Sequence, residues 1–130
     1  MSQTIHVAEA ASLQAALESY EQALTLFRQV GDRLGEANCY LAQGRIALEQ
    51  EDYQKALRLH YNAYQLYQQI QDRYRQARLL YYRSFVYEAM KEQLRATQDM
   101  EKALTIAQPL DLPFIDPFQE RLDELRGASS

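Results

Sequence analysis

The chain has 130 residues, of which 47% are hydrophobic and 25% charged, a composition typical of one soluble globular domain. The formal net charge of -4 argues against a nucleic-acid partner, which would require clustered Lys and Arg. No segment approaches the roughly 20 apolar residues of a membrane span, and the N-terminus "MSQTIHVAEAAS" lacks the pattern of a secretory signal. The single cysteine, Cys39, cannot form an internal disulfide, so we expect a cytoplasmic protein.

The first predicted element is one helix from about residue 5 to residue 30, either straight or kinked near Ser12. A turn is expected at Gly31-Asp32. In the following segment, "ANCYLAQGRIALEQ", steps of three and four residues place Ala37, Tyr40, Gly44 and Ala47 on one helical stripe. Small residues in such a stripe allow two helices to approach closely.

After a turn at Glu51-Asp52, the segment "EDYQKALRLHYNAYQLYQQ" predicts a further helix with Asp52 as its N-cap. Its inward stripe consists of Tyr53, Ala56, Leu57, His60, Ala63, Tyr64 and Tyr67. Another turn at Gln71-Asp72 leads into "ARLLYYRSFVYEAM", which repeats the small-residue stripe with Ala77, Leu80, Ser84 and Tyr87. No alternating strand pattern and no Asn-Gly or Asp-Gly hairpin signal occurs, so every element is predicted to be helical.

Beyond a turn at Lys91-Glu92 and one more helix, Pro109 is expected to end the regular pattern. Asp116 then suits an N-cap and Pro117 a first helical position. The residues that follow, Phe118, Leu122 and Leu125, form a short amphipathic face. We therefore predict a C-terminal helix that covers the last apolar face, as repeat arrays require.

These helices repeat with a period of 40 residues. "RQVGDRLGEANCYLAQG" and "QQIQDRYRQARLLYYRS" share Gln29/Gln69, Asp32/Asp72, Arg33/Arg73 and Ala37/Ala77. The alignment extends to three units, in which Ala16, Ala56 and Ala96 correspond, as do Ala23, Ala63 and Ala103. The sequence therefore predicts like helix pairs, each of which buries its apolar side against a neighbour.

This arrangement resembles the tetratricopeptide repeat, a helix-turn-helix unit that stacks into a superhelix. The positions that match the family pattern are Tyr40, Gly44, Ala47, Ala56, His60 and Ala63 in one unit, Leu80, Ser84, Tyr87, Ala96, Met100 and Ala103 in the next, and Ala16, Tyr20 and Ala23 in a partial first unit. The period of 40, instead of the usual 34, and the segment "GDRLGEA" are similar to the long-helix variant of kinesin light chain and several bacterial regulatory proteins. His60 and Met100 depart from the pattern, which has an aromatic residue there, and Ala47 is smaller than the usual Tyr.

The resemblance implies an all-α solenoid of antiparallel helix pairs, with about six helices in a single domain, residues 1–130. We divide it into a partial repeat (4–31), two repeats (32–71 and 72–111), a C-terminal capping helix (112–126) and a tail (127–130).

No catalytic or metal-binding constellation is evident in the sequence. His6 and His60 lie on different elements outside any zinc-binding spacing, and His60 falls where a core aromatic residue belongs. There is no Gly-rich phosphate loop, G-x-S-x-G or Cys-x-x-Cys motif. The acidic residues fit solvated faces and helix caps. We therefore expect no enzyme activity, no cofactor and no metal.

The resemblance also implies that the first helix of each pair lines a concave groove. The residues there that internal packing does not require are Asn38, Leu41, Arg45, Leu48 and Glu49 on one helix, and Arg78, Tyr81, Tyr82, Phe85 and Glu88 on the next. Exposed aromatic residues beside arginine are typical of peptide-binding hot spots, although tyrosine is also a common packing residue. The family's carboxylate clamp of Lys, Asn and Arg is largely absent at these positions.

We therefore expect a scaffold that binds a protein partner, through an apolar or aromatic segment with acidic neighbours, and neither nucleic acid nor a membrane. Two alternatives remain. The first helix lacks a cap, so the chain is either a fragment of a longer array or a homo-oligomer that associates through Leu17, Leu24 and Phe27. The resemblance also allows a sensor segment of a larger bacterial signalling protein.

Overall fold

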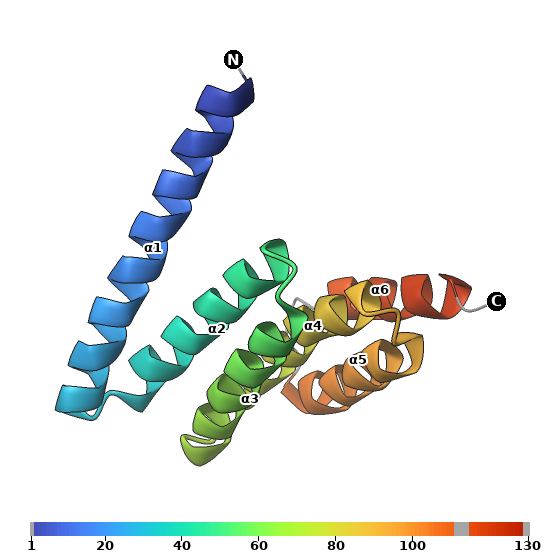
Figure 1. Cartoon of the computed structure of the whole chain (residues 1–130). Helices are drawn as coiled ribbons and strands as arrows, with labels where there is room; N and C mark the ends of the chain where they lie inside the picture. Colours follow the sequence, from blue (N-terminus) through green and yellow to red (C-terminus); the bar gives the residue numbers. More distant parts are fainter. Residues whose placement is uncertain (1, 111–114, 129–130) are drawn as a thin grey trace.

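The computed structural model describes the backbone of residues 2–110 and 115–128 (Figure 1), and every regular element in these ranges is helical. In chain order the elements are α1 (Ser2–Val30), α2 (Arg33–Glu49), α3 (Tyr53–Gln69), α4 (Arg73–Ala89), α5 (Gln93–Ala107), the 3-10 helix η1 (Gln108–Leu110) and α6 (Ile115–Ala128). The predicted all-α class is confirmed, as is the number of α-helices.

The helices stack as antiparallel pairs in chain order (Figure 1). The most extensive packing is of α2 on α3 and of α4 on α5, and each pair also contacts the next. Contacts between α4 and α6, such as the stacked rings of Tyr81 and Phe118, continue the row begun by α2 and α4. The described chain is therefore an α-solenoid in which α2, α4 and α6 are successive first helices. Within it α2 and α3 fall in segment 32–71, and α4 and α5 in segment 72–111.

Four turns between helices share one geometry. Gly31, Glu51, Gln71 and Lys91 all have positive φ angles, between 58° and 75°. The amide of the next residue donates to a carbonyl five residues back, at 2.8 to 2.9 Å, in each turn. Such a left-handed residue with a 6→1 hydrogen bond ends a helix in a Schellman motif. Asp32, Asp52 and Asp72 then cap the following helix by accepting from the amide three residues on, as expected for Asp52.

Small residues hold the pairs together at close range. Ala37, Ala56, Ala63, Ala77, Ala96 and Ala103 are all fully buried, as the repeat alignment predicts. Gly44 in α2 is required for contact with α3, because a Cβ atom there would lie only 2.4 Å from Cδ2 of buried His60. His60, which stands where the family pattern has an aromatic residue, is thus accommodated because the facing position in α2 is a glycine.

Replacing Ala63 with leucine tests this close approach. Ala63 packs in a cluster with Ala37, Leu41, Tyr67 and Leu79. We expect Ala63→Leu to lower the free energy of unfolding by about 1–3 kcal/mol, because added methyl groups force these neighbours apart. Urea denaturation of the variant and of Gln65→Leu, an exposed position two residues away, measures the effect. A stability equal to wild type would mean that Ala63 does not face α2.

The two ends of the array differ in how they are covered. At the C-terminal end, Phe118, Leu122 and Leu125 of α6 are all buried, as predicted. However, α6 begins at Ile115, so Asp116 lies in its first turn and does not precede it as a cap. At the other end, α1 is one continuous helix of 29 residues, longer than the 17-residue α2 on which it packs, so its N-terminal part extends beyond α2 (Figure 1).

The expected exposure of α1 is only partly correct. Leu17 and Phe27 are half-buried, but Leu24 is only 3% exposed. The residues that are open are instead Leu26, at 61%, and Val30, at 76%. Leu24 is covered because it lies on the side of α1 that packs towards α2.

Candidate peptide-binding groove

A pocket of about 290 Å³ lies between α2 and α4. We call it the aromatic pocket; its lining residues are Arg45, Leu48, Glu49, His60, Tyr81, Tyr82 and Phe85. The three aromatic side chains are half-buried, so each keeps part of its ring accessible while the rest is fixed by packing. Tyr81 contacts both other rings edge to face, with centroids 5.5 Å from Tyr82 and 5.1 Å from Phe85. Such a wall is rigid and suits an apolar or aromatic guest.

The last helix supports this wall from the side. The Phe118 ring stacks on Tyr81 at 5.3 Å, and the Arg121 guanidinium lies 3.8 Å from the centre of the Phe85 ring. Arg121 also donates to Ser84 Oγ at 3.2 Å and to Glu88 at 3.0 Å. Phe118 and Arg121 therefore cover part of the Tyr81 and Phe85 rings, which leaves less of each ring accessible to a partner. Glu88 binds Arg121 and so helps to hold α6 against α4.

His60 lies deepest among the residues of the aromatic pocket. Its side chain is fully buried, and neither ring nitrogen has a hydrogen-bond partner. Burial lowers the pKa of His60 to about 4, with the positive charges of Arg83 and Arg45 acting in the same direction. The imidazole is therefore neutral at physiological pH. The core position expected for His60 from the sequence is confirmed by this burial.

A second pocket, of about 210 Å³, adjoins the first and shares Arg45 with it. We call it the arginine pocket; its lining residues are Asn38, Leu41, Ala42, Arg45, Arg75 and Arg78. The guanidinium groups of Arg45 and Arg78 both lie over the Tyr82 ring, at 4.3 Å and 5.5 Å from its centre. Tyr82 thus fixes two cations at the boundary between the pockets.

Asn38 is oriented by a residue of α3. Its side-chain oxygen Oδ1 accepts a 2.6 Å hydrogen bond from the Tyr67 hydroxyl. Burial raises the pKa of Tyr67 to about 12, so this hydroxyl keeps its proton and remains the donor. The Asn38 amide group is consequently left to act as a donor.

Nine of the ten predicted groove residues line one of these two pockets, and Glu88 does not. The prediction missed Ala42, Arg75 and His60. Arg75 precedes Arg78 by three residues on α4, a spacing that puts both on one helix face and could have indicated it. His60 was assigned to the core between α2 and α3, and no sequence signal shows that it also reaches the pocket.

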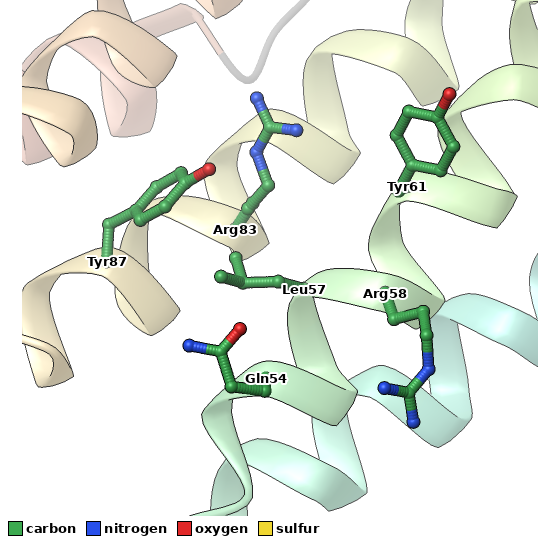
Figure 2. Close-up of a pocket in the computed structure, with 6 residues that line it drawn as sticks. All are labelled: Gln54, Leu57, Arg58, Tyr61, Arg83 and Tyr87. Atoms are coloured by element: carbon green, nitrogen blue, oxygen red, sulfur yellow. The ribbon is translucent and has the colours of Figure 1, made fainter.

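A third pocket lies between α3 and α4, away from this groove, with a volume of about 420 Å³. Figure 2 shows Leu57 between Gln54 and Arg83, with Arg58 and Tyr61 extending from α3 on the side away from Tyr87. Arg83 is engaged there, since it binds both carboxylate oxygens of Asp99 at 2.7 and 2.8 Å. This pocket is larger than the aromatic and arginine pockets, but the charge of its Arg83 is already neutralised by Asp99.

Two further features bear on function. Among the described residues, no three His, Cys, Asp or Glu side chains are grouped as a metal site would require. No described helix combines the length and apolar character needed to cross a membrane.

An all-α array of antiparallel helix pairs with an uninterrupted row of first helices defines the class of this protein. The family model described as tetratricopeptide repeat matches residues 6–69. Because the same helix pairing continues beyond residue 69, the match and the fold together support assignment of the chain to the tetratricopeptide repeat family. Repeats of this family generally mediate protein–protein interactions, and their fold is typically a non-catalytic scaffold.

The fold is also similar to the crystal structure of BtubC (BKLC) from P. vanneervenii, with a TM-score of 0.80 and 20% sequence identity. The similarity covers 92% of this chain and 50% of that one, so the chain spans about half the length of the neighbour. A comparison with curated proteins gives no match.

Proposed function

We propose that the chain binds a peptide segment of a protein partner in the groove between α2 and α4. The observation that carries this proposal is the adjacency of the two pockets, which share Arg45. An apolar or aromatic side chain of the partner enters the aromatic pocket, and an acidic neighbour faces the arginines. Large, rigid aromatic surfaces beside arginine favour binding because little side-chain entropy is lost.

Tyr82 is the residue on which this mode of binding depends most. It lines the aromatic pocket and also carries the guanidinium groups of Arg45 and Arg78. Phe85 contributes as well, although Arg121 covers part of its ring. Truncation of Tyr82 therefore removes contact area and releases two cations.

We expect Tyr82→Ala to weaken binding of a groove peptide by at least about 1 kcal/mol, a fivefold rise in dissociation constant, with helicity unchanged. Peptides selected against the wild-type chain from a random phage library supply the ligands, and fluorescence anisotropy measures affinity. Tyr61→Ala is the matched control, since Tyr61 is 56% exposed and lines the α3–α4 pocket. If Tyr61→Ala weakens binding of the selected peptides and Tyr82→Ala does not, the peptides bind at the α3–α4 pocket and the proposal is wrong.

A second candidate function, homodimerisation through α1, is favoured by the repeat alignment. Leu26 and Val30 occupy the positions of Leu66 in α3 and of Ile70, the C-cap of α3. Leu66 and Ile70 are half-buried against a cluster to which α2 and α4 also contribute. The equivalent side chains of α1 have no such covering helix among the described elements. A second copy, related by a two-fold axis, covers both faces at once. The outer face of α6 bears exposed Glu120 and Glu124 and does not suit an open head-to-tail array.

Light scattering across the micromolar range tests this second candidate. We expect a dimer mass that returns to the monomer mass in Leu26→Glu/Val30→Glu, because two charges per face cannot be buried together. A wild-type chain that stays monomeric throughout the range excludes it. A sensor role within a larger signalling protein remains a prediction, and no feature of the described residues supports it.

A further inference from the structure

The polar side chains that line the arginine pocket are hydrogen-bond donors, apart from one acceptor, Asn38 Oδ1, which is already engaged by Tyr67. Three arginines, Arg45 from α2 and Arg75 and Arg78 from α4, line it. Asn38 adds its amide donors, because its oxygen is held by Tyr67. No Asp or Glu lines this pocket, although the whole chain carries a net charge of -4. A local concentration of positive charge on an acidic protein is the arrangement that captures an anion.

The guanidinium groups are held in place before any ligand arrives. Arg45 and Arg78 both lie over the Tyr82 ring, a cation–π contact that does not require their N–H donors. Arg75 is fixed from the other side by Asp72, whose carboxylate accepts from Nη1 at 2.7 Å. Arg75 Nε is buried and has no partner in the described structure.

The count of charges distinguishes between possible anions. Three guanidinium groups less the one carboxylate of Asp72 leave a charge of +2 at the pocket. A carboxylate would neutralise one unit and offer two oxygens. A phosphate monoester carries about -1.5 to -2 at neutral pH and offers three acceptor oxygens. Charge and donor number both fit the phosphoryl group better.

We propose that the arginine pocket binds the phosphoryl group of a phosphorylated residue in the partner segment. This inference rests on the proposed function, because the segment reaches the pocket through the groove shared at Arg45. Phosphorylation of the partner would then strengthen binding, with Arg75 as an essential residue that the groove alone does not require.

Phenyl phosphate serves as the probe, because it carries an aromatic ring and a phosphate monoester. Titration of the ¹⁵N-labelled full chain at constant ionic strength and pH 7.5 follows the arginine Nε–Hε signals. We expect the signals of Arg45, Arg75 and Arg78 to shift, with a dissociation constant at least fivefold lower than that of phenylacetate, the matching carboxylate. Arg75→Gln should raise the constant for phenyl phosphate at least fivefold, and Arg58→Gln, at the α3–α4 pocket, should leave it unchanged.

Several outcomes overturn the inference. Equal binding of phenylacetate assigns the pocket to any oxyanion, and tighter binding of inorganic phosphate assigns it to a free ion. The inference is also wrong if phenyl phosphate shifts none of the signals of Arg45, Arg75 and Arg78. It is equally wrong if Arg75→Gln and Arg58→Gln raise the dissociation constant for phenyl phosphate by the same factor. If Arg75→Gln unfolds because Asp72 loses its partner, Arg78→Gln serves in its place. Failure here is separable from failure of the groove, because unphosphorylated selected peptides report on Tyr82 independently.

Discussion

Asp99→Ala is expected to lower the free energy of unfolding by about 3 kcal/mol. The Asp99 side chain in α5 is 8% exposed and that of its partner, Arg83 in α4, is 22% exposed. Both ends of the Arg83 guanidinium edge donate to this carboxylate. Removal of Asp99 leaves a largely buried cation without its anion, which costs more than the pair itself contributes to stability.

Urea denaturation at pH 7 measures the effect, with Glu101→Ala on the same helix as the control. Glu101 is half-exposed and lies 3.9 Å from Arg126, so we expect a loss below about 1 kcal/mol. The double variant Arg83→Met/Asp99→Leu should recover most of the lost stability, because no unpaired charge remains. A small loss in Asp99→Ala would show that Arg83 is solvated when its partner is absent.

The second large effect concerns acid stability. The folded-state pKa of His60, about 4, lies below the ordinary value of 6.5 because the ring is buried. Below pH 6.5 the unfolded chain binds a proton that the folded chain does not, so stability falls as pH falls towards 4. Between pH 7.5 and pH 5 the loss from this one residue is expected to be about 2 kcal/mol.

Comparison of wild type with His60→Leu isolates this contribution. The absolute stability of His60→Leu depends on packing against Gly44, so only the change with pH is compared. We expect the wild type to lose about 2 kcal/mol more than the variant when urea denaturation is repeated at pH 7.5 and pH 5. Parallel pH profiles for the two proteins would show that His60 is protonated as readily in the folded as in the unfolded chain.

The fold could be predicted from the sequence because it repeats. The period of 40 residues fixes every helix–helix turn from Gly31 to Lys91, and the recurrent alanines fix the buried face of each pair. The prediction was less successful at the two ends, where the array has a neighbouring helix pair on one side only. There Leu24 proved buried and Asp116 proved to lie within α6.

The sequence could predict which residues line the groove, but not which residues of other helices contact them. Helical spacing places Asn38, Arg45, Arg78 and Tyr82 on neighbouring first helices, and they do line the pockets. Contacts between distant elements, such as Arg121 on Phe85, depend on how α6 docks and have no local signal. For the same reason the sequence could not show that Tyr81 and Phe85 are half-covered.

The central claim is that a partner segment occupies the groove between α2 and α4. Chemical-shift mapping of the ¹⁵N-labelled chain with one peptide selected against it tests this claim most directly. We predict the largest perturbations at Asn38, Arg45, Arg78 and Tyr82. Perturbations confined to Arg58, Tyr61 and Tyr87, around the α3–α4 pocket, would contradict the claim.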